Sequence, residues 1–226
     1  MQIEIVHGPG NAAARLTLAA GETCTAEGGA MIAMSGDMAI QTSTHNKGKG
    51  GLLRAAKRML AGESFFLNHF TAGRQGGELW LATTLAGDML PYELKGETLI
   101  VQGGSYVASE PGVKIDLGWQ GFKSLLSGES IFWLHLSGTG KVVLNSFGAI
   151  YAVPVKGDYI VDTGHIVSFN ETLDFKISKA GRSWLASMLG GEGLVCRFSG
   201  QGTVWCQSHN PKSFGGVLGP LLRPRP

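Results

Sequence analysis

The chain has 226 residues, with 19 Lys and Arg against 17 Asp and Glu, a net charge of +2, and 43% hydrophobic residues. This apolar content excludes an intrinsically disordered chain, and the charge balance gives no reason to expect a nucleic acid as a partner. Glycine is the outlier with 35 residues, about twice its usual share of ~7%. Because the glycines separate short apolar runs without a fixed period, they indicate many tight turns between short strands.

The ends of the chain and the cysteines favour a cytoplasmic protein. No apolar run reaches the ~18 residues of a membrane-spanning helix. The first residues show neither the pattern of a signal peptide nor that of an organelle transit peptide. Cys24, Cys196 and Cys206 are odd in number, lack CxxC spacing and lie in apolar runs. We interpret them as small buried residues and expect no zinc site and no disulfide framework.

A strand, a glycine turn and a second strand occur together three times. Residues 21–33 and 96–108 align without a gap, and residues 157–167 form a slightly shorter third copy. The turns fall at Gly29, Gly104 and Gly164. Three such copies predict an internal repeat, and an internal repeat determines the expected fold more strongly than any single motif does.

A short helix is predicted downstream of each copy. A Gly-Glu pair recurs at 62–63, 128–129 and 191–192, and apolar residues at helical spacing precede it each time. The glycine stands where the C-terminal end of a helix often needs a positive φ. Two further apolar runs, separated by another glycine turn, are predicted to close each unit as strands.

The sequence therefore predicts one mainly β domain with short helices over residues 1–211. It contains three quasi-repeats of antiparallel hairpins at about residues 16–84, 92–146 and 154–208. Because one unit cannot bury its apolar face alone, we expect the three to close around a pseudo-threefold axis as a short double-stranded β-helix or barrel. Residues 212–226 are rich in Gly and Pro and are expected to form an irregular tail.

Five segments carry a resemblance to a known family. They are MQIEIVHGP at 1–9, EGGAM at 27–31, GESFF at 62–66, VDTGHIV at 161–167 and GLV at 193–195. Together they resemble the mitochondrial biogenesis (altered inheritance of mitochondria) family over about residues 1–211. The resemblance implies a fold similar to that of the trp RNA-binding attenuation protein. It also implies a role in mitochondrial inner-membrane organisation for the eukaryotic relatives, and it brings no catalytic residue.

Polar residues at equivalent positions of the three units form a candidate site, here called the polar column. Carboxylates beside imidazoles are suited to binding a metal and to acid–base chemistry. The alternative is structural, with each glutamate accepting backbone N–H groups at a tight turn. We favour the structural interpretation, because catalytic sites usually break symmetry and an arginine replaces one of the three histidines. The chain also lacks the His-x-His motif of a cupin-type metal site. We therefore expect no metal, no cofactor and no catalytic residue. The members of the polar column are Glu63, Glu129, Glu192, His69, His135 and Arg197.

Basic residues cluster in the first unit before its Gly-Glu pair. They lie opposite an apolar face, as in a basic amphipathic helix that contacts an anionic membrane surface or an acidic partner. The alternative is a helix that packs its apolar face on the sheet and leaves its bases in water. We favour this alternative because the equivalent segments of the other two units keep the apolar face with few bases. The basic residues are Lys47, Lys49, Arg54, Lys57 and Arg58.

These observations favour a non-enzymatic scaffold or assembly protein. Only 16% of the residues are charged, so much of the protein surface is expected to be apolar or rich in glycine. Contiguous apolar surface is typical of interfaces. We therefore expect a homo-oligomer, with a trimer as the first hypothesis. Other proteins or an anionic membrane surface are further candidate partners, and no nucleic acid is expected. The alternative function is a small-molecule or metal-binding β-barrel, with or without enzymatic activity, that uses the polar column.

Overall fold

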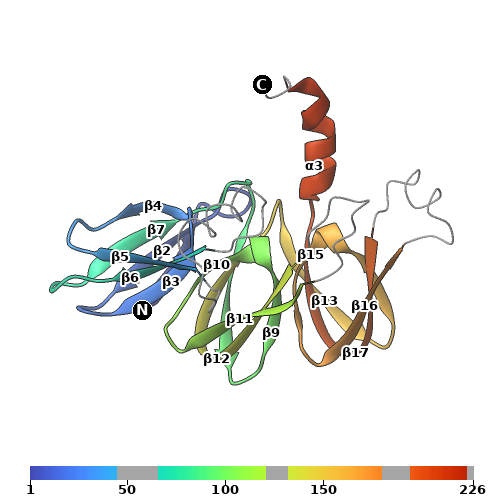
Figure 1. Ribbon diagram of the computed structural model, residues 1–226, viewed down its shortest axis with the longest axis horizontal. Coiled ribbons are helices and arrows are strands. Elements are labelled where there is room, and N and C mark those ends of the chain that lie inside the picture. The colour runs from blue at the N-terminus through green and yellow to red at the C-terminus, as the bar shows by residue number, and fades with distance from the viewer. Residues whose placement is uncertain (45–65, 121–131, 180–193, 223–226) are drawn as a thin grey trace.

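The computed structural model describes residues 1–44, 66–120, 132–179 and 194–222 (Figure 1). Within these ranges the chain is mainly β, all pairs of named strands are antiparallel, and one short α-helix follows the last strand. The mainly β class predicted from the sequence is confirmed. The three predicted short helices fall at 45–65, 121–131 and 180–193, outside the described residues.

The named elements follow one another in three groups along the chain. The first group is β1 (Gln2–Val6), β2 (Ala13–Leu18), β3 (Thr23–Glu27), β4 (Met31–Met34), β5 (Ala39–Thr44), β6 (Phe66–Thr71) and β7 (Gly77–Leu81). The second is β8 (Met89–Lys95), β9 (Leu99–Gln102), η1 (Gly103–Ser105), β10 (Tyr106–Ser109), β11 (Val113–Gln120) and β12 (Phe132–Asn145). The third is β13 (Ile150–Lys156), β14 (Tyr159–Asp162), η2 (Thr163–His165), β15 (Ile166–Asn170), β16 (Leu173–Lys179), β17 (Leu194–Gln207), α3 (Pro211–Leu218) and η3 (Gly219–Leu221).

The strands form four layers that follow one another along the longest axis of the molecule (Figure 1). Layer 1 has the order β1-β2-β7-β4. Layer 2 consists of β8, the second half of β12, β10, β3, β6 and β5. Layer 3 consists of β13, the second half of β17, β15, β9, the first half of β12, and β11. Layer 4 consists of β14, the first half of β17, and β16. The long strands β12 and β17 therefore pass from one layer into the next.

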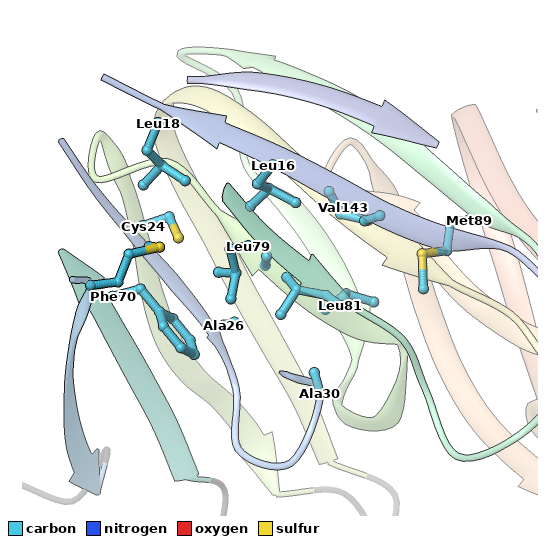
Figure 2. Close-up of a cluster of buried hydrophobic side chains, with 14 of the residues drawn as sticks. Leu16, Leu18, Cys24, Ala26, Ala30, Phe70, Leu79, Leu81, Met89 and Val143 are labelled. Atoms are coloured by element: carbon cyan, nitrogen blue, oxygen red, sulfur yellow. The ribbon is translucent and has the colours of Figure 1, made fainter. Parts of the chain in front are cut away.

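Apolar cores fill the spaces between successive layers. Between layers 1 and 2, Leu16 and Leu79 of layer 1 meet Phe70 and Val143 of layer 2 (Figure 2). A second core between layers 2 and 3 joins Leu94 and Leu144 to Leu99 and Leu134. In the third core, between layers 3 and 4, Trp133 and Phe169 meet Phe175 and Phe198 with their rings edge to face.

The sequence of each strand reflects how many of its faces are covered. Layers 2 and 3 have a core on both sides, so β10 (YVAS) and β9 (LIVQ) are almost continuously buried. A strand covered on both faces needs an unbroken apolar run. Layer 4 has a core on one side only, and β16 (LDFKISK) alternates apolar and polar residues. The hydrophobic pattern therefore reports the position of a strand in the stack.

Two sequence-based expectations about the architecture are wrong. Within the described residues the strands do not close around an axis, because the pairing path through layers 2 to 4 runs from β13 to β5 and has two free ends. Among the named strands, one pair joins the first group to the second, β10 with β3, and one pair joins the second to the third, β15 with β9, so the groups follow one another in line. The tail is also not irregular at its start, because Pro211–Leu218 forms helix α3.

Candidate functional site

His69 is held between two hydroxyl groups on layer 2. Its strand β6 lies between β3 and β5. Thr25 Oγ1 is 3.0 Å from His69 Nδ1, and Ser43 Oγ is 2.7 Å from His69 Nε2. A hydroxyl can donate to one ring nitrogen and accept from the other, so the neutral imidazole is fully paired. A metal or a substrate would have to displace one of these hydroxyls.

His135 and Arg197 lie in different surroundings from His69. His135 is half-buried on layer 3, opposite Asp116 of β11, and shares the face of β12 that carries Trp133. Arg197 is exposed on layer 4, where its Nε donates to Ser178 Oγ at 3.1 Å. The neighbours of Arg197 along β17 pack into the third core, so Arg197 itself points away from that core.

The structure does not bring the described members of the polar column together. His69, His135 and Arg197 lie on three successive layers, and stacked sheets are ~10 Å apart. Each faces away from the core to which its neighbour, Phe70 or Leu136 or Phe198, contributes. The other members, Glu63, Glu129 and Glu192, lie outside the described residues, as do the basic residues Lys47, Lys49, Arg54, Lys57 and Arg58. Within the described ranges, no group of three or more His, Cys, Asp or Glu side chains could hold a metal ion.

The three cysteines are buried and free, as the sequence predicted. Burial raises the pKa of Cys24 to about 12, that of Cys196 to about 12 and that of Cys206 to about 11. The thiolate is the reactive and metal-binding form of cysteine. These three thiols are therefore neutral at physiological pH and serve as core residues.

Glu27 is a titratable residue that sequence reasoning did not single out as a site. It is half-buried at the end of β3, opposite Leu67 of β6. Burial raises the pKa of its carboxyl group to about 7. The available sequence signal was a carboxylate at the end of a predicted strand, directly before the Gly28-Gly29 turn. Its raised pKa makes it a pH-sensitive point of the fold.

Helix α3 is the most exposed apolar element of the described chain. Asn210 caps its first turn by accepting bonds from the backbone N–H groups of Lys212 and Ser213, and Pro211 occupies the first turn. One contact with the sheets is the edge-to-face pair of Phe214 with Phe147, whose ring centroids are 5.4 Å apart. No residue of α3 is buried, and the helix stands off the layers in Figure 1. The Asn-Pro pair was the local signal that could have predicted this helix.

The apolar side chains of this C-terminal segment continue past the helix into η3. Between 39% and 79% of the surface of each is exposed, so water covers much of every one of them. Exposed apolar side chains that lie together along one segment are typical of an interaction surface. The residues are Phe214, Val217, Leu218, Leu221 and Leu222.

Residues 3–209 of the chain match the family model described as mitochondrial biogenesis AIM24. The chain belongs to the AIM24 family. The resemblance found in the sequence is confirmed over nearly its whole length.

AIM24 relatives are found in bacteria. An uncharacterized protein of Streptococcus pyogenes serotype M6 is 28% identical over 196 residues, covering 84% of this chain and 78% of that protein. A crystal structure of another Streptococcus pyogenes protein has a TM-score of 0.81 and 26% identity, and it covers 98% of this chain and 99% of that one. The same architecture therefore extends across both chains from end to end.

Membership of the AIM24 family does not assign a ligand or a reaction to this chain. The described parts also contain no helix with both the length and the apolar character needed to cross a bilayer. The candidate functional features that remain are surfaces, namely the C-terminal segment around α3 and the free edges of the layers.

Proposed function

We propose that this AIM24-family chain is a non-enzymatic assembly protein that self-associates and docks on an anionic membrane surface through its C-terminal segment. The observation that carries the docking role is the exposed apolar set on α3, on η3 and on the residue that follows η3. It is here called the docking segment and comprises Phe214, Val217, Leu218, Leu221 and Leu222. It stands off the sheets and is therefore accessible to a large flat partner.

The charge around the docking segment supports a lipid partner. After Glu192 the sequence contains no Asp or Glu, whereas Lys212, Arg223 and Arg225 lie in or beside the segment. An apolar segment that carries bases and no acids along its own sequence suits the interface of an anionic bilayer, where leucines enter the headgroup boundary and bases meet phosphates. An apolar protein partner would bind the apolar side chains without needing the excess of positive charge beside them.

The strand pairings support three quasi-repeats within the assembly role. In the second unit β12 pairs with β8, β9, β10 and β11, and in the third β17 pairs with β13, β14, β15 and β16. In the first unit β6 and β7 together pair with β2, β3, β4 and β5. The proposal therefore keeps the repeat but places its units in line. A chain of similar units linked by similar joints suits a protein that assembles by adding further copies.

Vesicle co-sedimentation tests the docking role. The full chain should sediment with phosphatidylcholine vesicles that contain phosphatidylglycerol and should stay in solution with pure phosphatidylcholine vesicles. Leu221→Glu places a charge on a side chain that is 79% exposed, so it should lower the bound fraction at least tenfold without unfolding the protein. Gln2→Glu, an exposed site on β1 of layer 1, is the charge-matched control and should bind like wild type. Unchanged binding of Leu221→Glu would contradict the proposal.

A further inference from the structure

Two joints inside the chain are built from the same kind of strand pair. In the joint between the first and second units, β3 pairs with β10 and Ala26 lies opposite Ala108. In the joint between the second and third units, β9 pairs with β15 and Val101 lies opposite Ser168. Each joint merges strands of two units into one continuous layer.

Strands β4 and β14 are the counterparts of these joint strands at the two ends of the stack. β4 pairs with β7 and shows a register shift after its first residue, as β10 does on β12 and β15 does on β17. β14 pairs with the first half of β17, as β9 does with the first half of β12 and β3 does with β6. Within the described residues, neither β4 nor β14 has a partner on its other edge.

Positions that the internal joints bury are exposed at the two ends but remain apolar. Val107 and Val167, which follow the first residue of β10 and of β15, have no exposed surface, whereas the counterpart Ile32 of β4 is 56% exposed. Ile100 of β9 is 3% exposed, whereas the counterpart Ile160 of β14 is 51% exposed. Exposed apolar side chains at such positions, here Ile32 and Ile160, are typical of an interface that a second chain completes.

Several other free edges carry features that discourage pairing. Edge strands β8 and β13 contain Pro91 and Pro154, which lack a backbone N–H group. Edge strands β11 and β16 carry charged residues, for example Lys114 and Lys176. Such features protect a sheet edge from pairing with another chain. β4, with the sequence MIAM, has neither feature, and β14 has a charge only at its last residue.

We propose that copies of this chain associate head to tail, with β14 of one copy pairing antiparallel to β4 of the next copy. The internal joints set the register, so that Ala33 lies opposite Val161 and Met34 lies opposite Ile160. Layer 4 of one copy and layer 1 of the next copy then form one continuous sheet. Within the chain, the joint of β10 with β3 makes layer 2 continuous in the same way, and the joint of β15 with β9 makes layer 3 continuous. The contact is heterologous, and it closes into a ring or extends as a filament according to the rotation between copies. This inference deepens the self-association in the proposed function and names the surface that carries it; a ring of three copies would be the expected trimer.

Light scattering after size exclusion tests the proposal on the full chain at micromolar concentration. Wild type should exceed the monomer mass of 23.8 kDa. Ile32→Lys and Ile160→Lys should each be monomeric, because every head-to-tail contact needs both strands. Both side chains are more than half exposed in the single chain, so the fold should survive, which circular dichroism checks.

Mixing the two variants separates the head-to-tail contact from a two-fold one. Ile32→Lys keeps an intact β14 and Ile160→Lys keeps an intact β4, so an equimolar mixture should form a 1:1 dimer and nothing larger. A contact of β4 with β4, or of β14 with β14, would instead leave one single variant oligomeric. Monomeric wild type, an oligomeric single variant or a monomeric mixture would each overturn the proposal.

Cysteine cross-linking tests the register. Met34→Cys in the Ile160→Lys protein and Ile160→Cys in the Ile32→Lys protein should form an intermolecular disulfide on mixing. Gln2→Cys in place of Met34→Cys is the control and should not react, and the three native cysteines are buried. Absence of the cross-link in a dimeric mixture would overturn the register. Since the docking segment is unchanged in these proteins, vesicle binding by the monomeric variants reports on the docking role separately.

Discussion

The inner layers 2 and 3 and the end layers 1 and 4 contain strands that the proposed repeat makes equivalent, but different surroundings cover these strands. β10 and β15 of the inner layers are fully buried at the position after their first residue, whereas β4 of layer 1 exposes 56% of Ile32 at the same place. The backbone pairing and the register shift are shared. The burial of a residue in this protein is therefore decided by its layer, and the end layers retain side chains suited to an inner layer.

The largest expected effect comes from placing a charge at this position. Val107→Lys would bury an ammonium group in the apolar core between layers 1 and 2, because Val107 has no exposed surface. We expect a loss of more than about 4 kcal/mol in the free energy of unfolding, measured by urea denaturation.

Ile32→Lys is the matched control for this prediction, since it makes the same kind of change at the counterpart position on layer 1. Its side chain already reaches water, so the free energy of unfolding should change by less than about 0.5 kcal/mol. Both changes should be made in the Ile160→Lys protein, so that association does not enter the comparison. An equal loss of unfolding free energy for Val107→Lys and Ile32→Lys would show that inner and end layers do not differ in this way.

A smaller effect is expected from the ionisation of Glu27 on layer 2. Burial raises the pKa of this carboxyl group in the folded state from 4.5 to about 7. Below pH 4.5 the group is protonated in both states; as the pH rises towards 7 it ionises first in the unfolded chain. The folded state then holds the extra proton, so the free energy of unfolding should fall by about 2–3 kcal/mol over this interval and then level off.

Glu27→Gln tests the origin of this pH dependence. The amide cannot ionise, so the difference in unfolding free energy between pH 5 and pH 8 should be smaller than in wild type by about the amount assigned to Glu27. Urea titrations of both proteins across this range give the two slopes. Parallel profiles would show that Glu27 is not the group responsible.

The smallest effect compares hydrogen bonds at two equivalent positions of the polar column. Ser43→Ala removes the hydroxyl 2.7 Å from His69 Nε2 on the half-buried face of layer 2 and should cost about 1 kcal/mol. Ser178→Ala removes the acceptor of Arg197 on the exposed face of layer 4, where water replaces it, and should have no measurable cost. Urea denaturation distinguishes the two, and a larger cost for Ser178→Ala would contradict the prediction.

The candidate site was only partly predictable, because a residue's position along a strand does not say which layer the strand joins. The sequence alignment placed His69, His135 and Arg197 at equivalent positions, and in the structure their strands pair with β3, β9 and β14. Convergence required the three side chains to face one axis, whereas each faces away from the core to which its neighbour along the strand contributes. The docking segment was missed for another reason: its glycines suggested an irregular tail, although Asn210 and Pro211 begin a helix there.

The sequence by itself determined the mainly β class, the buried cysteines and the family, because apolar runs and glycine turns act over a few residues. It also encoded which strands have two covered faces, through the difference between the unbroken LIVQ of β9 and the alternating LDFKISK of β16. Only the tertiary structure decided that the three groups of strands follow one another in line. That arrangement depends on which edge strands meet, such as β10 with β3 and β15 with β9. Backbone hydrogen bonds between strands far apart in the sequence are nearly independent of side-chain identity, so no local pattern specifies them.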